Sequence, residues 1–244
     1  MKPLVTIFIL VYNNADQLDT TVESVISQDY DNAEIIISDD GSTKYDTAVL
    51  HEYESRLKKR YDNVRVNINE QNVGTVKHLN RVFHMAKGKY LFSCSSGDRY
   101  AGSNVISRLV ERFESTGALL ITTRRVDEYT DRTDKVRPAK AIGLALNLCP
   151  KLLLGYMINK KNVISGCCTF YSKKLFETEG YLDERYHLVE DYPLYVKLLS
   201  KGVKIHWYGI KSVVHTIGGV STGKIHPSIY KDIELLRSEY KKDR

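Results

Sequence analysis

Polar side chains that can bind a charged ligand follow the ends of four apolar runs in the first half of the chain. The four clusters are VYNN (11–14), SDDGS (38–42), NEQNVG (69–74) and SSGDRY (95–100). Asp39 and Asp40 can accept hydrogen bonds from a base or a ribose, and the ring of Tyr12 can pack against a base. A metal ion can neutralise phosphates beside them. Asp98 is the only acid in its cluster, whereas a site for a diphosphate usually has two or three.

The apolar runs before these clusters are expected to be parallel strands. They lie at 4–12, 34–40, 64–69 and 89–94, and helical patterns separate them. Strands that alternate with helices of this length indicate βαβ units and a mostly parallel sheet. Ligands of such sheets bind beyond the carboxyl ends of the strands. Each cluster alone is an ordinary set of turn formers, but all four in this order predict one binding rim.

The second half is less regular. Further strands and helices are predicted at 117–125, 166–180, 190–202 and 204–209, whereas 127–162 is mixed. Apolar residues at helical spacing then predict a C-terminal amphipathic helix: Ile225, Ile229, Ile233, Leu236 and Tyr240. This helix either packs on the body of the protein or lies on a membrane surface.

The composition limits the classes of partner. The formal net charge is +6, and residues 122–161 hold nine Lys or Arg against four acids. This balance favours an anionic partner, namely a nucleotide diphosphate, a lipid phosphate or an anionic bilayer, although a generally basic surface would look the same. The chain has neither G-x-G-x-x-G nor G-x-x-x-x-G-K-[ST], which argues against a Rossmann dinucleotide site and a P-loop. It has no nucleic-acid recognition motif, so no nucleic-acid partner is expected.

The compartment is inferred from the N-terminus and the cysteines. No apolar stretch approaches ~18 residues, and the N-terminal run ends in a polar turn without a signal-peptide cleavage site. The four cysteines show no C-x-x-C spacing, so neither zinc nor a disulfide framework is indicated. Cys167 and Cys168 are expected to be small packed residues. We therefore expect a cytoplasmic protein, with a place at the inner face of the cell membrane as an option.

Five motifs together resemble a known family. VTIFILVYNN, DDGS, NVGTVKHLN, SSGD and the distant EDYPLYVKL resemble the motif series of family 2 glycosyltransferases with the GT-A fold. Each motif is weak, but the series is specific and extends over roughly residues 3–220. The resemblance implies an α/β GT-A fold, an inverting mechanism, a nucleotide-sugar donor and usually Mg²⁺ or Mn²⁺. It also divides the chain into a glycosyltransferase domain at 1–220, with a nucleotide-binding half at 1–100 and an acceptor-binding half at 101–220, and a C-terminal helix at 221–244.

The resemblance assigns donor-binding roles to the strand-end clusters. Tyr12 falls where the family contacts the base, Asp39 matches the acid that hydrogen-bonds the base, and Asp40 supports that loop. Lys77, near the start of an expected helix, is placed to face the diphosphate. Four further residues of the same clusters are assigned to the nucleotide site: Asn14, Gly41, Gly74 and Ser96.

The resemblance assigns the metal and diphosphate site to SSGD, but this sequence departs from the family pattern. The family motif is often D-x-D-D, whereas Ser95 and Gly97 stand here where acids are common, and only Asp98 remains. One carboxylate with phosphate oxygens and waters can still hold Mg²⁺. His215, in a later element that resembles the family, is a candidate to ligate the metal as well. We therefore expect weak or dispensable metal binding.

The resemblance assigns catalysis to EDYPLYVKL. Inversion needs a base on the face opposite the leaving nucleotide, and Asp191 matches that base, with Glu190 beside it. Two adjacent acids repel each other, which can raise one pKa towards a useful range. The alternative, purely structural interpretation is that Asp191 is the N-cap of a helix.

The preferred function is an inverting glycosyltransferase that uses a UDP-sugar and extends a surface glycan on a lipid-linked or free saccharide acceptor. Two alternatives stay open: a sugar-phosphate nucleotidyltransferase and a degenerate, non-catalytic binding protein. The Gly-rich, Arg-containing loop of a sugar-phosphate nucleotidyltransferase is absent from this sequence. The second is favoured by Ser95 and Gly97 and disfavoured by Asp39, Asp98 and Asp191.

Overall fold

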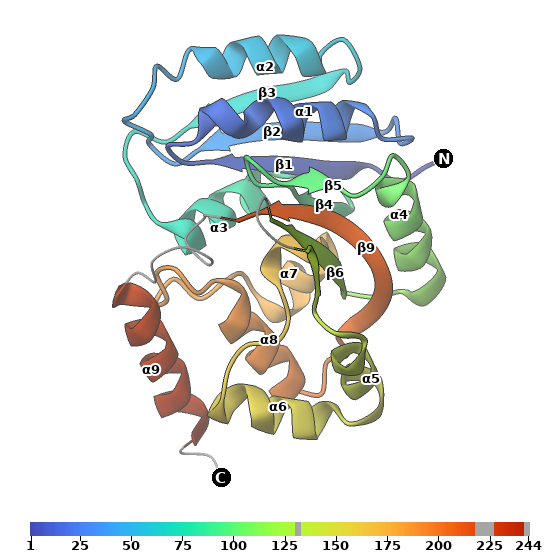
Figure 1. Ribbon diagram of the computed structural model, residues 1–244, viewed down its shortest axis with the longest axis vertical. Helices are drawn as coiled ribbons and strands as arrows, with labels where there is room; N and C mark the ends of the chain where they lie inside the picture. Colours follow the sequence, from blue (N-terminus) through green and yellow to red (C-terminus); the bar gives the residue numbers. More distant parts are fainter. Residues whose placement is uncertain (130–132, 218–226, 242–244) are drawn as a thin grey trace.

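The first half of the chain forms the expected parallel sheet. The computed structural model describes residues 1–129, 133–217 and 227–241. Strand β1 (Val5–Val11) pairs in parallel with β2 (Ala33–Asp39) and with β4 (Tyr90–Ser93), and β2 pairs in parallel with β3 (Asn63–Ile68). The connecting helices are α1 (Leu18–Ile26), α2 (Val49–Leu57) and α3 (Thr75–Met85), with a short 3₁₀ turn η1 (Ala15–Gln17) before α1. These crossovers bring the carboxyl ends of the strands to one edge (Figure 1).

Both faces of this sheet are buried, which explains why its strands are continuously apolar. Val5, Ile7 and Ile9 of β1 pack in one cluster with α1, α2 and α4 (Val105–Thr116). Phe8 points to the opposite face and packs in a second cluster with α3 and α8 (Asp191–Ser200). The alternation follows from the two-residue period of a strand.

Beyond β4 the sheet becomes mixed. Its order is β3-β2-β1-β4-β8-β6-β9-β5, and β7 pairs with β6 at the side. The added strands are β5 (Arg99–Tyr100), β6 (Leu120–Glu128), β7 (Lys135–Arg137), β8 (Thr169–Ser172) and β9 (His206–Thr216). Antiparallel pairing joins β8 to both β4 and β6, so the expected parallel arrangement holds for the first four strands rather than for the whole sheet. Register shifts interrupt the β6–β9 pairing, and β9 curves from beside α5 to beside β5 (Figure 1).

The region that was only mixed in the sequence contains two helices, α5 (Lys140–Leu148) and α6 (Pro150–Asn159). Among the described residues no single helix is long and apolar enough to cross a membrane. The α5–α6 pair reaches that length and composition only in combination, and the two helices are bent by 119° to each other.

The C-terminal helix is α9 (Pro227–Lys241), and it packs on the body of the protein. Asp232 and Leu236 are buried, and Ile233 and Tyr240 pack against the second core cluster. The predicted apolar position Ile225 lies outside the described residues. The remaining helical elements are η2 (Gly166–Cys168) and α7 (Lys173–Glu179).

Candidate active site

The strand-end clusters meet at the carboxyl edge of the sheet. Asn14 donates from Nδ2 to the Ser96 carbonyl oxygen over 3.1 Å, and Ser96 Oγ donates to the Asn14 carbonyl oxygen over 2.7 Å. The N–H of Asn13 donates to Ser42 Oγ over 2.7 Å. Clusters that are far apart in the sequence therefore form one rim. The Asn14 and Ser96 side chains are used within the protein, so they fix loops of the predicted nucleotide site.

Asp39 and Asp40 have different surroundings, although both are buried. The Asp39 carboxylate accepts hydrogen bonds from Ser42 N–H over 2.8 Å, from Ser42 Oγ over 2.6 Å and from the Tyr45 hydroxyl. Asp40 accepts from four groups of the 69–74 loop: Asn69 Nδ2, Asn72 Nδ2, Val73 N–H and Gly74 N–H, all at 2.8–3.1 Å. Asp40 thus holds the 69–74 loop against the end of β2, whereas the resemblance assigned it to the support of its own loop.

Two predicted glycines allow the loops of the rim to come close. Gly41 has φ +68°, and a Cβ there would lie 2.4 Å from the Gln71 carbonyl carbon. Gly74, the residue before α3, has φ +87°, and a Cβ there would lie 2.8 Å from the His187 ring. Both positions therefore require glycine for conformation and for space.

Two predicted ligand-contacting side chains are free to reach outwards. Tyr12 is 49% exposed at the end of β1, and Lys77 is exposed in the first turn of α3. The ring and the ammonium group are available to a ligand on the rim, as the nucleotide interpretation requires.

The predicted metal residues Asp98 and His215 lie in direct contact. Asp98 Oδ1 is 2.7 Å from His215 Nδ1 and also accepts a hydrogen bond from the Thr216 N–H over 3.2 Å. Burial lowers the pKa of His215, but the hydrogen bond and charge of Asp98 outweigh it, so the pKa is raised above its ordinary value. The contact joins residues 117 positions apart in the sequence. Gly218 and Gly219, which follow His215 in the same motif, lie outside the described residues.

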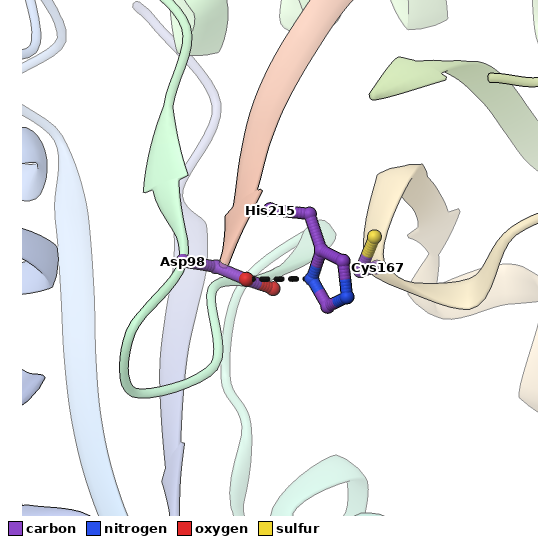
Figure 2. Close-up of side chains that lie close together, drawn as sticks. All are labelled: Asp98, Cys167 and His215. Atoms are coloured by element: carbon purple, nitrogen blue, oxygen red, sulfur yellow. Dashed lines mark hydrogen bonds and ion pairs between the residues drawn. The ribbon is translucent and has the colours of Figure 1, made fainter. Parts of the chain in front are cut away.

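A third potential ligand, Cys167, lies beside this pair. Single ligand atoms of Asp98, Cys167 and His215 all lie within 4.8 Å of one another. Figure 2 shows the His215 ring between the Asp98 carboxylate and the Cys167 sulfur. The interaction with the neighbouring Cys168 lowers the pKa of the Cys167 thiol, against the opposing effect of burial. Cysteine spacing could not reveal this arrangement, because the three ligands come from three distant segments.

The cluster fits a divalent cation, the group that the family resemblance implies. Its donors are a carboxylate, an imidazole and a thiol, and His215 Nε2 is buried with no hydrogen-bond partner among the residues that the structure describes. A buried nitrogen without a partner costs about 1–3 kcal/mol. A cation at this nitrogen would remove that cost.

The structure also explains why position 97 carries no acid. Gly97 has φ +94°, and a Cβ there would lie 2.4 Å from Gln17 Oε1. The Gly97 N–H donates a hydrogen bond to Thr21 Oγ1 over 3.0 Å, and a different backbone conformation at Gly97 would break this bond. The tight turn presents Asp98 to His215, and a side chain at position 97 would disturb that turn.

The predicted base, Asp191, lies in a largely desolvated setting. It is the first residue of α8, and Glu190 occupies the cap position, so the interpretation of Asp191 as the N-cap is wrong by one residue. Its Oδ2 accepts a hydrogen bond from Asn162 Nδ2 over 3.3 Å. Burial raises the pKa of Asp191 to about 6, against the opposing effect of hydrogen bonds from backbone N–H groups and Asn162. Burial, and then the Asp191 charge, raise the pKa of Glu190 to about 8.

A residue that the sequence did not reveal, Asp232 of α9, holds the loop before this pair. Its Oδ2 accepts hydrogen bonds from the backbone N–H groups of His187, Leu188 and Val189 at 2.8–3.0 Å. An acid within an amphipathic helix carries no signal of such a role. The C-terminal helix therefore fixes the approach to Glu190.

The turn η2 lies between the base and the cation cluster. A Cβ on Gly166 would lie 3.0 Å from Asp191 Oδ2, and the next residue, Cys167, belongs to the cluster with Asp98. The site thus combines a polar rim, a cluster of three potential metal ligands and a carboxylate with a raised pKa. This combination suits transfer of a group from a diphosphate to a hydroxyl.

The strand-end clusters lie at the carboxyl edge of an α/β sheet. Residues 6–180, more than half of the chain, match the model of the family described as glycosyl transferase family 2. The chain belongs to this family, which confirms the resemblance in its motifs.

Relatives include several bacterial glycosyltransferases. An uncharacterized glycosyltransferase of Rickettsia prowazekii is 27% identical over 242 residues, which are 95% of this chain and 70% of the relative. The Escherichia coli UDP-Glc:alpha-D-GlcNAc-diphosphoundecaprenol beta-1,3-glucosyltransferase WfaP is 27% identical over 240 residues, 96% of this chain and 83% of the relative. The poly-beta-1,6-N-acetyl-D-glucosamine synthase of Staphylococcus aureus is 24% identical over 225 residues, 88% of this chain and 52% of the relative.

Solved structures show the same fold. A fragment of S. aureus TarS in complex with UDP-GlcNAc superposes with a TM-score of 0.73 at 17% identity, over 98% of this chain and 66% of the fragment. The GT-A fold expected from the motifs is thereby confirmed, with its sheet mixed rather than parallel beyond β4.

Proposed function

We propose that this protein is an inverting glycosyltransferase that moves a sugar from a nucleotide diphosphate, preferably UDP, to a hydroxyl of a glycan or lipid-linked saccharide. The proposal rests on one observation. Asp191, whose pKa is raised to about 6, lies on one side of the turn η2, and the Asp98–His215 pair lies on the other side. The names of WfaP and of the TarS complex, which specify UDP-Glc and UDP-GlcNAc, support a UDP-sugar as the donor.

The proposed reaction uses Asp191 as a general base. The acceptor hydroxyl gives its proton to the Asp191 carboxylate while its oxygen forms a bond to the anomeric carbon. The bond between that carbon and the diphosphate oxygen breaks, and its electron pair leaves with the nucleotide diphosphate. Attack opposite the leaving group inverts the configuration. Hydrogen bonds from Asn162 and from backbone N–H groups orient the carboxylate.

The remaining groups bind and orient the donor. The exposed Tyr12 ring would pack against the nucleobase, whereas the buried Asp39 carboxylate, bonded to Ser42 and Tyr45, would hold the turn beside it. Lys77 is exposed near the α3 N-terminus, where a phosphate is favoured. Asp98 and His215 would hold Mg²⁺ or Mn²⁺, which neutralises the charge of the diphosphate when bound. The tight turn at Gly97 removes one acid but leaves Asp98 directed at His215, so we favour a working enzyme over the degenerate binding protein.

The function can be tested with a panel of nucleotide-sugars. We expect a UDP-sugar to raise the melting temperature, and we expect transfer to an acceptor with inverted anomeric configuration, seen by NMR. Asp191→Asn is the matched control, because it should keep the donor-induced shift and lose transfer. Binding with neither hydrolysis nor transfer would support the degenerate binding protein instead, and no shift with any nucleotide would contradict the donor site.

We further propose that the protein works at the inner face of the cell membrane, on a lipid-linked acceptor. The α5–α6 pair exposes Leu144, Leu148, Leu152 and Tyr156 by 44–76%, with the exposed Lys140 and Lys151 on the same two helices. Apolar side chains among cations suit an anionic bilayer surface. The acceptor named for WfaP, a diphosphoundecaprenol saccharide, supports the same location.

Vesicle sedimentation tests this surface. The protein should bind vesicles of phosphatidylcholine with phosphatidylglycerol more strongly than vesicles of phosphatidylcholine alone. The double substitution Leu148→Ser, Leu152→Ser should weaken binding about tenfold or more, because each buried leucine contributes about 1.5–3 kcal/mol. Tyr230→Ser is the matched control, since Tyr230 is 58% exposed on α9. Equal loss in both variants would argue against an α5–α6 surface.

A further inference from the structure

The cluster of Asp98, Cys167 and His215 contains a thiol, which is not among the ligands that Mg²⁺ prefers. Mg²⁺ prefers six oxygen ligands and keeps several waters. Thiolate and imidazole ligands favour Zn²⁺ and related borderline cations, whereas carboxylate suits both groups. The chain offers one atom of each kind within 4.8 Å.

We infer that Cys167 is a third protein ligand of the cation held by Asp98 and His215, and that it makes the site select Zn²⁺-like cations over Mg²⁺. Three protein ligands and one open position are typical of catalytic zinc sites. The open position would take water or a phosphate oxygen.

The imidazole provides an independent observation. His215 is only 8% exposed, and its Nε2 has no hydrogen-bond partner among the described residues, while Nδ1 is hydrogen-bonded to Asp98. The ring lies between the carboxylate and the sulfur (Figure 2). An outer carboxylate that orients a metal-binding imidazole is a recurrent feature of zinc sites. Asp98 Oδ1 is bonded in this way to His215, and the other carboxylate oxygen, Oδ2, would be the direct ligand of the cation.

The charges around Cys167 suit a thiolate. Arg125 Nη1 lies 3.7 Å from Cys167 Sγ and also donates to Ser165 Oγ over 2.9 Å. The guanidinium charge would by itself oppose a cation, and it is only partly offset, because the buried Asp127 that pairs with Arg125 Nε over 2.7 Å also pairs with Arg137 Nε over 3.0 Å. The two negative charges of Asp98 and a Cys167 thiolate would still exceed the single charge of Arg125. Cys167 is partly exposed, so a cation can reach it from solvent.

The use of this cation in sugar transfer rests on the proposed function, whereas its binding through Cys167 does not. The test therefore needs no donor: Co²⁺ is titrated into the metal-free protein, and absorption from a thiolate–Co²⁺ bond is recorded. We expect the band to saturate near one equivalent in the unsubstituted protein, and to be absent in Cys167→Ser. Cys149→Ser, which removes a partly exposed cysteine between α5 and α6, is the matched control and should keep the band.

Calorimetry with Zn²⁺ and Mg²⁺ tests the selectivity. Loss of even an outer partner of a metal ligand costs about 10–100-fold in affinity, so Cys167→Ser should weaken Zn²⁺ binding at least about tenfold and leave Mg²⁺ binding unchanged. No thiolate band in the unsubstituted protein, or the same band in Cys167→Ser, would overturn the inference.

If Cys167→Ser does not fold, the Cys149→Ser protein still tests whether Cys167 binds the cation. Its other two thiols, Cys94 and Cys168, are buried, so a thiolate–Co²⁺ band there must come from Cys167. A protein that shows the thiolate–Co²⁺ band but transfers no sugar would contradict the proposed function and support this inference. A protein that transfers sugar but shows no band would support the proposed function and contradict this inference.

Discussion

Replacing the proposed base should stabilise this protein while removing its activity. Asp191→Asn keeps the size of the side chain and removes its charge. Burial is the main reason that the pKa of Asp191 rises from 3.8 to about 6, so the carboxylate is less favourable in the folded than in the unfolded chain. Active-site groups commonly carry such a cost, because catalysis requires a charge where folding alone would not place one.

The magnitude follows from the difference in pKa. One pKa unit corresponds to 1.36 kcal/mol, so the rise to about 6 gives about 3 kcal/mol of lost stability once Asp191 is fully ionised. The folded state binds the proton more tightly, so the free energy of unfolding falls as pH rises from about 4 to about 6 and stays low above that. The amide loses one good hydrogen bond of about 1 kcal/mol. The net gain above pH 7 is therefore about 2 kcal/mol.

Thermal unfolding of both proteins at two pH values measures this gain. For a chain of this size about 2 kcal/mol raises the melting temperature by roughly 4–8 °C. At pH 4, where Asp191 is protonated, the gain should vanish, and the variant should be slightly less stable than the unsubstituted protein. Above pH 7 sugar transfer should fall by about 10²–10⁴-fold, as is typical for loss of a general base, and the loss should be much smaller at pH 4, where Asp191 is already protonated. A variant that is less stable by the same amount at both pH values would refute the desolvated carboxylate.

Four other tests address neighbouring features. Transfer by the unsubstituted protein should rise with pH through about 6 as Asp191 loses its proton, and a rate that is flat from pH 5 to 8 would contradict a titrating base. Asp232→Asn should lower the free energy of unfolding by about 1–2 kcal/mol, because three backbone N–H groups lose a charged acceptor, and should lower kcat more than KM; an unchanged kcat would exclude positioning through that loop. Gly166→Ala places a Cβ 3.0 Å from Asp191 Oδ2 and should shift the pH profile of transfer to higher pH. An unchanged profile would show that the η2 turn moves to make room for the methyl group. Gly97→Asp should cost about 1–3 kcal/mol for its backbone conformation without tightening Mg²⁺ binding, and tighter binding in calorimetry would show that the missing acid matters.

Much of the rim could be predicted from the sequence, because its causes are local. A strand buried on both faces must be apolar throughout, so β1, β2 and β4 were visible as runs, and the polar residues after them marked the carboxyl edge. The α5 and α6 helices were not visible, because their apolar residues lie on both buried and exposed faces. The antiparallel pairing of β8 was not visible either, since strand order in the second half depends on contacts between distant segments.

The motifs were enough to identify the family and the sheet of the first half, and they named candidate site residues such as Asp39, Asp98 and Asp191. The groups that lie beside these candidates come from distant segments and became visible in the folded chain. The curved strand β9 carries His215 to Asp98, and η2 carries Cys167 to both. α9 brings Asp232 to the loop before Glu190. The physical reason is that a motif records short-range spacing along the chain, whereas ligands and hydrogen-bond partners are selected by distance in the folded protein.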